Sequence, residues 1–328
     1  MKVAIIGVGA ISRLHINAVL SAGGKIVSLC DISPEKCRQA QEKYHLQCSV
    51  YENYIEMLEK EELDVVHVCT PHYLHAEMTI HALKRNVNVL CEKPLAISRQ
   101  ELADIKAVVE KTDAKLAVCH QTRYNETNKF VKEYLTGKKI QSATGTLCWQ
   151  RDAAYYSQGA WRGKMATEGG GVMINQALHT LDLLQWFCGM PISVISHTFN
   201  DTLKGVIDVE ETAFGIFKTK EGCNFIVSAT NSAKHSFPIS IMIRTEEETI
   251  IILEDNIFIN GKLYVKSDGL PVFGKEVWGT GHIKLIKDFY RCIETQTPFP
   301  IGYEEGKNVI ELIMAMYESD GEEIFLEA

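Results

Sequence analysis

The chain lacks several features that would place it in a specialised class of protein. Its 328 residues contain no apolar run near the roughly 20 residues of a membrane span. No internal repeat or low-complexity tract is present. Positive charge is not in excess, since 34 Lys and Arg against 42 Asp and Glu leave a net charge of −8. We therefore expect neither a nucleic-acid nor a membrane partner, because both would need a basic surface.

Paired cysteines are also missing. Ten cysteines are scattered along the chain without a Cys-x-x-Cys motif, and several stand inside apolar runs. This usage predicts free thiols that act as small hydrophobic residues in a reducing compartment. Without clustered ligands, no zinc or other metal site is predicted. The first apolar run begins at Lys2, which leaves no room for a signal peptide, so we expect a cytoplasmic protein.

The length allows about two domains. Over residues 1–120, short and nearly continuous apolar runs alternate with helical patterns, which is typical of a doubly wound parallel sheet. We expect residues 1–120 to form a Rossmann domain that binds NAD. The predicted strands are Val3–Ile6, Lys25–Cys30, Val65–Cys69, Val87–Cys91 and Leu116–Cys119, and the predicted helices are Leu14–Ala22, Pro34–Tyr44, Tyr54–Lys60, Leu74–Arg85 and Arg99–Lys111.

The pattern changes in the second half of the chain. Longer runs with alternating side chains predict, for residues 121–328, an α+β domain with a largely antiparallel open sheet. One broad face of such a sheet must be covered by helices or by another subunit. The predicted strands are Ile192–Phe199, Thr212–Phe217, Asn224–Ala229, Phe237–Ile243 and Thr249–Leu253, and the predicted helices are Tyr124–Leu135, Asn175–Phe187, Ile283–Glu294 and Tyr303–Glu318.

A glycine turn follows the first apolar run. Gly7 permits a tight turn, and Gly9 lets the backbone approach a pyrophosphate without a Cβ in the way. The helix that begins near Ser12 directs its unpaired N–H groups at that phosphate. An ordinary βα turn or a methyltransferase-type loop is the alternative. The pattern predicts a dinucleotide contact from Gly7, Gly9, Ala10, Ile11 and Ser12.

A carboxylate closes the second strand. Asp31 stands about 20 residues beyond the glycine turn, where an acid bonds the ribose hydroxyls of NAD and repels a 2′-phosphate. No arginine follows Asp31 to accommodate that phosphate. NAD is therefore favoured over NADP. A simple acid at a helix N-terminus is the weaker interpretation, because Ser33-Pro34 already supplies a cap and a first-turn proline.

Two further strand ends carry polar residues. Thr70 and Pro71 can contact the cofactor, although a capped strand-to-helix turn would explain them equally, and His75 can be an ordinary helix histidine. Glu92 and Lys93 end the next strand, and both charges are costly to bury unpaired. We expect Lys93 beside the nicotinamide, as a catalytic or substrate-binding residue.

A third motif combines glycines with polar residues. Gly169–Gly171 would allow a close approach of the backbone to a ligand before the predicted helix begins. On that helix, Asn175, His179 and Asp182 fall within about 60° of one face. Histidine suits proton removal near neutral pH, and Asn175 or Asp182 would orient its ring. The alternative is a buried histidine held by Asp182. A metal site here is not predicted, because Asn is a poor ligand.

With these motifs the chain resembles the Gfo/Idh/MocA oxidoreductases, the family of glucose–fructose oxidoreductase and inositol dehydrogenase. The match is the ordered set of Gly7-x-Gly9, Thr70-Pro71 with His75, Glu92-Lys93-Pro94, and Gly169–Gly171 with His179 and Asp182. The resemblance implies a Rossmann domain followed by an α/β domain whose open sheet commonly mediates oligomers. It also implies NAD(P)-dependent oxidation or reduction at a hydroxyl-bearing carbon of a sugar, cyclic polyol or nucleotide sugar.

The resemblance further assigns individual residues. It places Lys93 and His179 in the catalytic centre, with His179 as general base. Many relatives have Asp where this chain has Asn175, and Asn cannot accept a proton, so His179 would pass its proton to water or to Asp182. Cofactor contacts are implied for Glu92, Gln121, Trp161 and Arg162, and substrate contacts are expected for Arg123, Tyr124, Tyr155 and Tyr156.

Two other functions and an assembly remain open at this point. A glycosidase could use NAD for transient oxidation and release a sugar without net NADH, as some relatives do. A dinucleotide or sugar sensor could use the same scaffold, although binding alone does not require both Lys93 and His179. By analogy, we expect a homodimer or homotetramer that forms through the C-terminal sheet.

Overall fold

The computed structural model describes residues 1–265 and 280–326 of the chain. These residues form two compact units. The first holds Met1–Tyr124 and, beyond residue 280, the chain up to Lys307, whereas the second holds the chain from Asn125 to residue 265 and from Asn308 to residue 326. The helix α11, Gly281–Glu294, thus belongs to the first unit although it is distant in sequence. The domain boundary at residue 120 stays a prediction.

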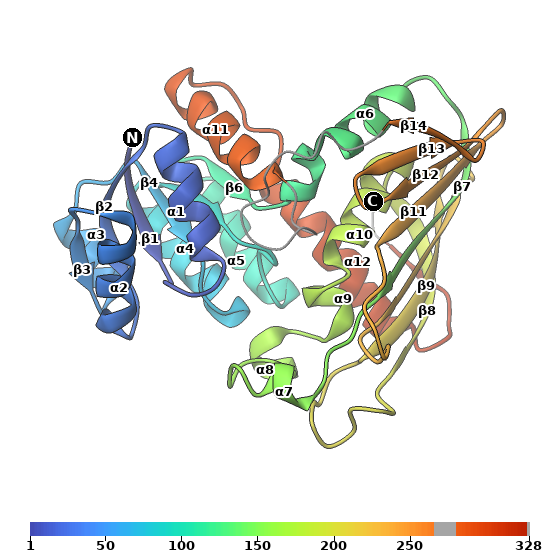
Figure 1. Cartoon of the computed structure of the whole chain (residues 1–328), viewed down its shortest axis with the longest axis horizontal. Helices are drawn as coiled ribbons and strands as arrows, with labels where there is room; N and C mark the ends of the chain where they lie inside the picture. The colour runs from blue at the N-terminus through green and yellow to red at the C-terminus, as the bar shows by residue number, and fades with distance from the viewer. Residues whose placement is uncertain (266–279, 327–328) are drawn as a thin grey trace. The chain divides into compact units, whose positions relative to one another are not determined.

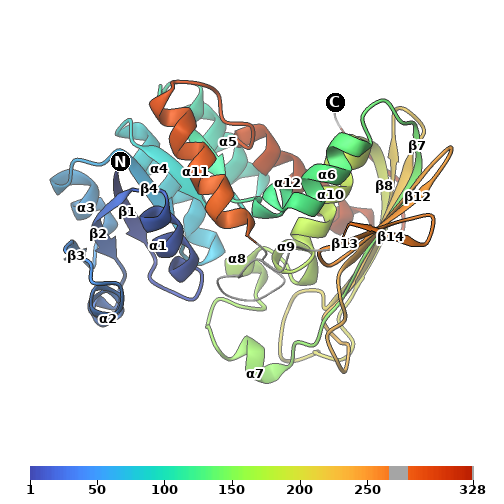
Figure 2. The ribbon, with the colours of Figure 1, turned by 45° about the horizontal axis from the view of Figure 1, so that its top comes forward.

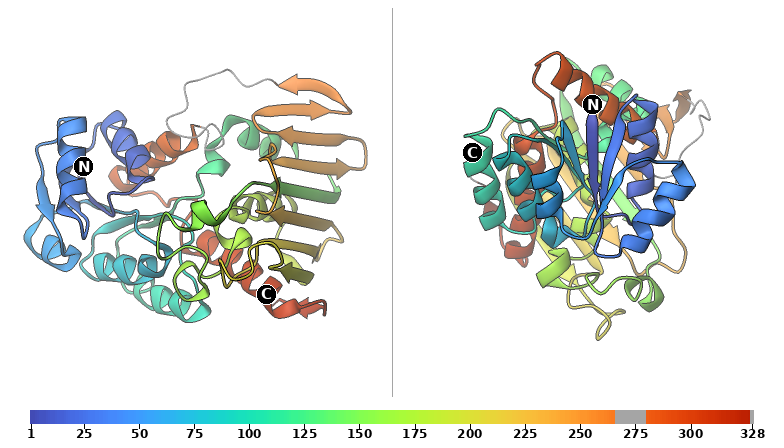
Figure 3. Two further views of the ribbon diagram at one scale, coloured as in Figure 1. Left: turned by 60° about the horizontal axis from the view of Figure 1, so that its bottom comes forward. Right: turned by 90° about the vertical axis from the view of Figure 1, so that its left-hand side faces the viewer.

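The first unit contains a six-stranded sheet with the order β3-β2-β1-β4-β5-β6. All of its strand pairs are parallel. Figure 3 shows helices on both faces of this sheet. The predicted doubly wound parallel sheet is therefore confirmed. Its strands are β1 Lys2–Ile6, β2 Lys25–Cys30, β3 Ser49–Tyr51, β4 Val65–Val68, β5 Asn88–Cys91 and β6 Leu116–Val118.

The helices of this unit follow local signals. Helix α2 begins at Pro34, directly after Ser33, and helix α3 begins after Asn53, whose side chain accepts from Ile55 N and Glu56 N. Proline at the first helical position and asparagine at the cap both favour a helix start. The helices are α1 Ser12–Ser21, α2 Pro34–Tyr44, α3 Tyr54–Lys60, α4 His75–Lys84 and α5 Arg99–Val109.

Helix α11 packs on the sheet side that carries α1. Figure 2 shows α11 beside α1, in agreement with the contacts between the two helices. The Tyr290 hydroxyl of α11 lies 2.9 Å from Nε2 of the buried His67 on β4. Tyr303, at the start of α12 (Tyr303–Ser319), donates to the Leu102 carbonyl. The chain therefore returns to its first unit after building most of the second.

The second unit contains a nine-stranded sheet with the order β14-β13-β12-β11-β7-β10-β9-β8-β15 (Figure 1). Its pairs are antiparallel except for β10 with β7. The predicted mostly antiparallel sheet is confirmed. Its strands are β7 Ile140–Cys148, β8 Pro191–Phe199, β9 Thr212–Thr219, β10 Asn224–Thr230, β11 Ser240–Thr245, β12 Thr249–Leu253, β13 Asn256–Ile259, β14 Lys262–Val265 and β15 Ile324–Phe325.

Side chains alternate between the two faces of this sheet. Phe217 and Phe225 point inward, are fully buried and stack with their ring centroids 4.8 Å apart. Burial of side chains this large contributes about 1.5–3 kcal/mol each. The helices that follow Asn125 are α6 Glu126–Tyr134, α7 Ala153–Tyr156, α8 Met165–Glu168, α9 Val172–Asn175 and α10 Leu178–Cys188.

Three predicted elements need correction. Strand β11 begins at Ser240, not at Phe237, whose side chain is 60% exposed. The helix predicted over Asn175–Phe187 is divided into α9 and α10, because Ala177 N bonds back to the Val172 carbonyl and closes the first turn. The helix predicted over Tyr124–Leu135 begins at Glu126, after a 3₁₀ turn over Gln121–Tyr124. No helix among the described residues is both long and apolar enough to span a bilayer.

Candidate active site

The predicted cofactor residues of the first unit lie at one edge of its parallel sheet. Gly7 follows β1, Asp31 follows β2, Thr70 follows β4, Lys93 follows β5 and Gln121 follows β6. Ligands of open α/β sheets bind outside the carboxyl ends of the strands. The topology therefore brings together residues from five segments that the sequence separates.

The glycine turn is built for a close approach. Gly7 has a φ of +89°, and a Cβ there would lie 2.7 Å from the Cys69 carbonyl oxygen. A Cβ at Gly9 would meet no atom of the described residues within 4 Å, so protein packing does not require that glycine. The buried Ser12 donates to the Gly9 carbonyl at 2.8 Å and begins α1. The turn and the helix start fit a dinucleotide pyrophosphate.

Asp31 is held in place by three groups. Its Oδ2 accepts from Val8 N at 2.8 Å, its Oδ1 accepts from Ser33 N at 2.9 Å, and Lys36 Nζ lies 3.5 Å from Oδ1. A carboxylate offers about four acceptor positions, so capacity remains for ribose hydroxyls. Lys36 is a cation near this carboxylate that the sequence pattern did not reveal.

His75 joins two of the loops. Its Nδ1 lies 2.7 Å from the Pro94 carbonyl oxygen, and its Nε2 lies 2.8 Å from the Thr70 carbonyl oxygen. The ring is 1% exposed, and burial lowers the pKa of His75. In this position the ring ties the loop after β4 to the loop after β5. Its direct contact with a cofactor stays a prediction.

Glu92 lies beneath Lys93 in the interior of the first unit. Its Oε1 lies 2.8 Å from His15 Nε2 and 3.6 Å from His282 Nε2, and its Oε2 accepts from the Lys93 backbone at 3.3 Å. Burial opposes ionisation, but the interactions of Glu92 with His15 and His282 outweigh it and hold the pKa of Glu92 well below its usual range. An ionised Glu92 therefore anchors the segment that carries Lys93, whose peptide bond with Pro94 is cis.

The residues after β6 are mostly buried. Gln121 is 2% exposed, and Arg123 is 6% exposed. The Tyr124 hydroxyl donates to Asp288 of α11 at 2.6 Å, and its ring stacks on Phe299. Burial raises the pKa of Tyr124 well above its usual value. The predicted cofactor contact of Gln121 and the substrate contacts of Arg123 and Tyr124 stay predictions.

In the second unit, aromatic and cationic side chains gather around Tyr155. Its hydroxyl accepts from Arg162 Nη1 at 2.6 Å and from Gln176 Nε2 at 3.2 Å. The guanidinium groups of Arg151 and Arg162 each lie 4.8 Å from the centre of the Tyr155 ring, and Arg162 also lies 4.6 Å from the Trp161 ring. The structure thus brings together Tyr155, Trp161 and Arg162, three of the predicted contacts.

The glycine motif has a different local cause from the one expected. A Cβ at Gly171 would lie 1.8 Å from the Glu210 carbonyl oxygen, and one at Gly170 would lie 2.0 Å from the Tyr317 hydroxyl. Gly169 has a φ of +84° and caps α8. The glycines therefore accommodate the protein's own segment before β9 and its helix α12, so their presence is not in itself a sign of a ligand.

Asn175, His179 and Asp182 do not share one helix face, which corrects the prediction. Asn175 ends α9, whereas His179 and Asp182 lie on α10. Asn175 and His179 are half-buried, but Asp182 is fully buried and accepts from Gln185 at 3.3 Å. Asn175 and His179 are therefore exposed to a similar degree, whereas Asp182 is not exposed.

Two buried carboxylates hold this region, and the sequence analysis missed both. Glu168 accepts from Gly163 N and from the Asn175 side-chain amide. Glu210 accepts from Gly171 N at 2.8 Å, from Met173 N at 2.9 Å and from the Tyr317 hydroxyl at 3.0 Å. Burial raises the pKa of Glu210 to about 7. Glu168 stands directly before the three glycines and Glu210 stands between Asp208 and Glu211, so no local pattern marked either residue as buried.

The chain matches family models over most of its length. Residues 1–120 match the model of the oxidoreductase family with an NAD-binding Rossmann fold, and residues 129–251 match the GFO/IDH/MocA C-terminal domain. The two models together span well over half of the chain. The match to an NAD-binding domain confirms NAD as the predicted cofactor.

Curated proteins and solved structures show the same similarity. The chain is 22% identical to a myo-inositol 2-dehydrogenase of Thermotoga maritima, over 97% of this chain and 96% of that protein. It is 23% identical to a D-glucoside 3-dehydrogenase of Escherichia coli, over 97% and 95% of the two chains. The WlbA dehydrogenase of Bordetella pertussis, solved with NADH and UDP-GlcNAcA, has a TM-score of 0.87 at 24% identity and covers 100% of this chain and 99% of its own.

Proposed function

The chain belongs to the Gfo/Idh/MocA family of NAD-binding oxidoreductases, and from this premise we propose that it transfers a hydride between NAD and a hydroxyl-bearing carbon of a sugar, cyclic polyol or nucleotide sugar. Its relatives include a dehydrogenase of inositol, a dehydrogenase of a glucoside and a dehydrogenase solved with NADH and UDP-GlcNAcA. The observation that carries the proposal is the position of Lys93. This half-buried lysine follows β5, at the same edge of the sheet as the glycine turn after β1.

The residues of the first unit suit NAD. The open position at Gly9, the start of α1 and the anchored carboxylate of Asp31 provide for a pyrophosphate and for ribose hydroxyls. When bound, NAD supplies the acceptor for the hydride that leaves the substrate carbon.

Lys93 and His179 carry the proposed chemistry on the substrate. During oxidation, the imidazole of His179 takes the proton of the substrate hydroxyl. The ammonium of Lys93 bonds the same oxygen and stabilises its developing negative charge. General acid–base assistance of this type contributes about 10²–10⁴ in rate. During reduction, His179 returns the proton to the oxygen.

Asn175 has a positioning role in this proposal. Its amide nitrogen donates to Glu168, which fixes the direction of the side chain. Since Asn cannot accept a proton, we propose that it orients the substrate and that the His179 proton passes to water. Tyr155 and Arg162 are the proposed substrate and cofactor contacts of the same unit, and their mutual hydrogen bond fixes both side chains.

A substrate panel tests the proposal. Purified protein with NAD is incubated separately with inositols, aldoses, glucosides and nucleotide sugars, and NADH absorbance is followed. We expect at least one class to yield NADH in proportion to substrate consumed. Sugar release without net NADH would instead identify the glycosidase. Tight NAD binding without turnover of any compound would identify a sensor, and either outcome overturns the proposal.

A further inference from the structure

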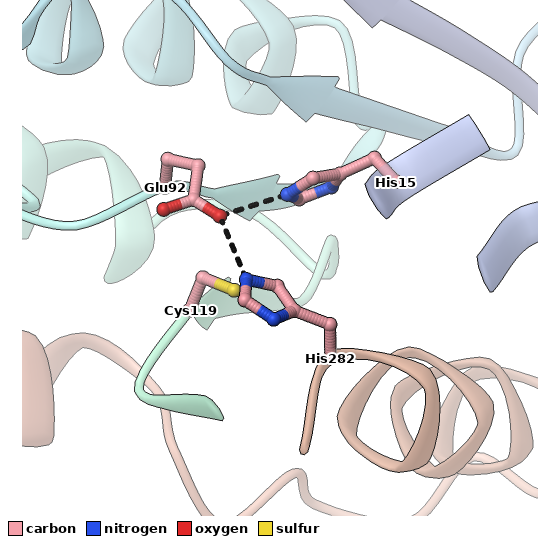
Figure 4. Close-up of side chains that lie close together, drawn as sticks. All are labelled: His15, Glu92, Cys119 and His282. Atoms are coloured by element: carbon pink, nitrogen blue, oxygen red, sulfur yellow. Dashed lines mark hydrogen bonds and ion pairs between the residues drawn. The ribbon is translucent and has the colours of Figure 1, made fainter. Parts of the chain in front are cut away.

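Four side chains from distant parts of the sequence meet in the interior of the first unit. They are His15 of α1, Glu92 after β5, Cys119 after β6 and His282 of α11 (Figure 4). All four are buried, and their ligand-type atoms lie within 4.8 Å of one another. We name this set the inner cluster. The proposed hydride transfer uses neither its two imidazoles nor its thiol.

The donor atoms of the inner cluster form a set that a particular ion prefers. Imidazole nitrogen, carboxylate oxygen and thiolate sulfur are all ligand types that bind zinc in proteins. With the usual zinc–ligand distances, neighbouring ligand atoms in a tetrahedral site lie about 3.3–3.8 Å apart. His282 Nε2 lies 3.6 Å from Glu92 Oε1, which already matches this spacing and exceeds the usual length of a hydrogen bond.

The charges of the inner cluster also suit a divalent ion. The side chain of Glu92 is 7% exposed, and that of His282 is 5% exposed, so water contributes little to their stabilisation. A zinc ion bound by one carboxylate, one thiolate and two neutral imidazoles forms a set with no net charge. Binding would break the S–H bond of Cys119, form a metal–sulfur bond and release the proton to solvent.

Outer contacts hold one of the imidazoles in a ligand orientation. His15 directs Nε2 at the inner cluster, and its Nδ1 lies 2.9 Å from His67 Nδ1. Nε2 of His67 in turn lies 2.9 Å from the Tyr290 hydroxyl. Metal-bound histidines characteristically donate their second ring N–H to a hydrogen-bond acceptor, which fixes the ring and its tautomer, and His67 Nδ1 takes that place here.

We propose that the inner cluster is a structural zinc site that fastens α11 to the parallel sheet of the first unit. Four protein ligands complete a tetrahedron and leave no position for substrate, so the site is structural. It joins residues 15, 92, 119 and 282, and therefore links the returning helix to the sheet. The site shares Glu92 with the segment that carries Lys93, but its readout, bound metal, is independent of hydride transfer.

Cobalt binding provides the test. The full chain is stripped with a chelator, dialysed against Co²⁺ and then against Zn²⁺, and its metal content is measured. We expect about one equivalent per chain, with a near-ultraviolet band from thiolate-to-cobalt charge transfer. Saturation with Zn²⁺ at about 100 times its dissociation constant should raise the melting temperature by about 5–10 °C.

Three variants make the test specific. Cys119→Ser should abolish the charge-transfer band, and His282→Gln should lower the bound metal at least tenfold. Cys292→Ser removes a buried thiol that lies on α11 but outside the inner cluster. This variant should retain both the band and the metal. A wild-type protein that binds no metal, or a Cys119→Ser protein that keeps the band, would overturn the proposal. If one of the two cluster variants does not fold by circular dichroism, the other decides.

Discussion

Lys93 is the residue on which the proposed chemistry depends most. Its backbone N–H is tied to Glu92, which the buried His15 holds from beneath, so the segment that presents the ammonium is fixed. We predict that Lys93→Ala lowers kcat by about 10²–10⁴-fold, because the developing oxyanion loses its cation. NADH binding, followed by fluorescence titration, should change by less than about threefold.

Lys84→Ala provides the control for this substitution. Lys84 is an exposed lysine at the end of α4, in the same unit. This variant should keep wild-type turnover. A Lys93→Ala enzyme that retains near-normal kcat would show that the ammonium does not take part in the reaction.

We propose that a second single residue, Asp31, determines the preference for NAD over NADP. Asp31→Ala removes the acceptor for the ribose hydroxyls and leaves Lys36 near the position of a 2′-phosphate. We predict that kcat/KM for NAD falls about 10–100-fold, since hydrogen bonds to charged groups contribute about 1.5–3 kcal/mol, while kcat/KM for NADP rises. The double variant Asp31→Ala with Lys36→Ala should lose the gain with NADP. An unchanged NAD-to-NADP ratio would contradict this role for Asp31.

Part of the site was predictable from single residues, and the reason is topological. The ends of parallel strands meet at one sheet edge, so locating the strands also located Gly7, Asp31, Thr70 and Lys93. Glu168 and Glu210 follow no such rule. Glu168 bonds Asn175, which is 7 residues away, and Glu210 bonds Gly171 and Met173, which are 39 and 37 residues away. His15 meets His282 only because α11 returns to the first unit. Pairings of this kind leave no periodic trace in a sequence.

At the scale of the element, a buried carboxylate holds the start of α9. Glu210 accepts the N–H groups of Gly171 and Met173 at the start of α9, and Tyr317 donates to the same side chain. This short helix carries Asn175. The protonation state of Glu210 is therefore coupled to the stability of the segment that precedes His179.

The raised pKa of Glu210 predicts a pH dependence of stability. Burial raises this pKa to about 7, compared with about 4.3 in an unfolded chain. Between these pH values the folded protein holds a proton that the unfolded chain releases. The contribution of Glu210 to the free energy of unfolding is therefore full below about pH 4 and is lost as the pH rises to about 7, with an amplitude of about 4 kcal/mol.

Urea unfolding of the wild type and of Glu210→Gln over this pH range isolates the effect. Other groups titrate equally in both proteins, so the difference between their free energies of unfolding reports Glu210 alone. We expect that difference to fall as pH rises from about 4 to about 7 and then to level off. A difference that does not vary with pH would show that Glu210 titrates alike in the folded and unfolded chains.

The elements themselves were predictable to different degrees. The buried parallel strands are short apolar runs, and five of the six were predicted with both bounds within one residue of the structure. Strand β7 was missed because its inward positions include Ala143 and Gly145, which are too small to mark an alternation. Gly145 is needed there, since a Cβ would lie 2.6 Å from Thr180 of α10. Tertiary packing, not local pattern, made this strand difficult to recognise.

At the scale of the whole molecule, one face of the nine-stranded sheet is apolar and exposed. Paired positions align Ile195, Ile216, Ile226, Thr144 and Met242 in a row across five adjacent strands. The opposite face is covered by α10 and α12, which contact Gly145 and Gly215. We propose that a second copy of this chain covers the row. An exposed apolar patch of this kind is typical of an interface, and a twofold axis would bring the same row of the two copies face to face.

Substitution within the row tests this assembly. We predict that Ile216→Glu weakens self-association at least about 100-fold, since the interface would bury an unpaired charge. Ile216 is 46% exposed in the single chain, so the substitution should leave the fold intact. Lys262→Glu on β14 should associate like the wild type. Light scattering that shows a wild-type monomer, or an oligomer that survives Ile216→Glu, would contradict the proposed interface.

The central proposal is that Lys93 and His179 act on one substrate oxygen. Single-turnover measurements of hydride transfer in the wild type, Lys93→Ala, His179→Ala and the double variant test it most directly. We predict that the double variant is hardly slower than the slower single variant, because residues that act together lose their effect together. Losses that multiply in the double variant would mean that the two residues act independently, and an undiminished rate in either single variant would remove that residue from the mechanism.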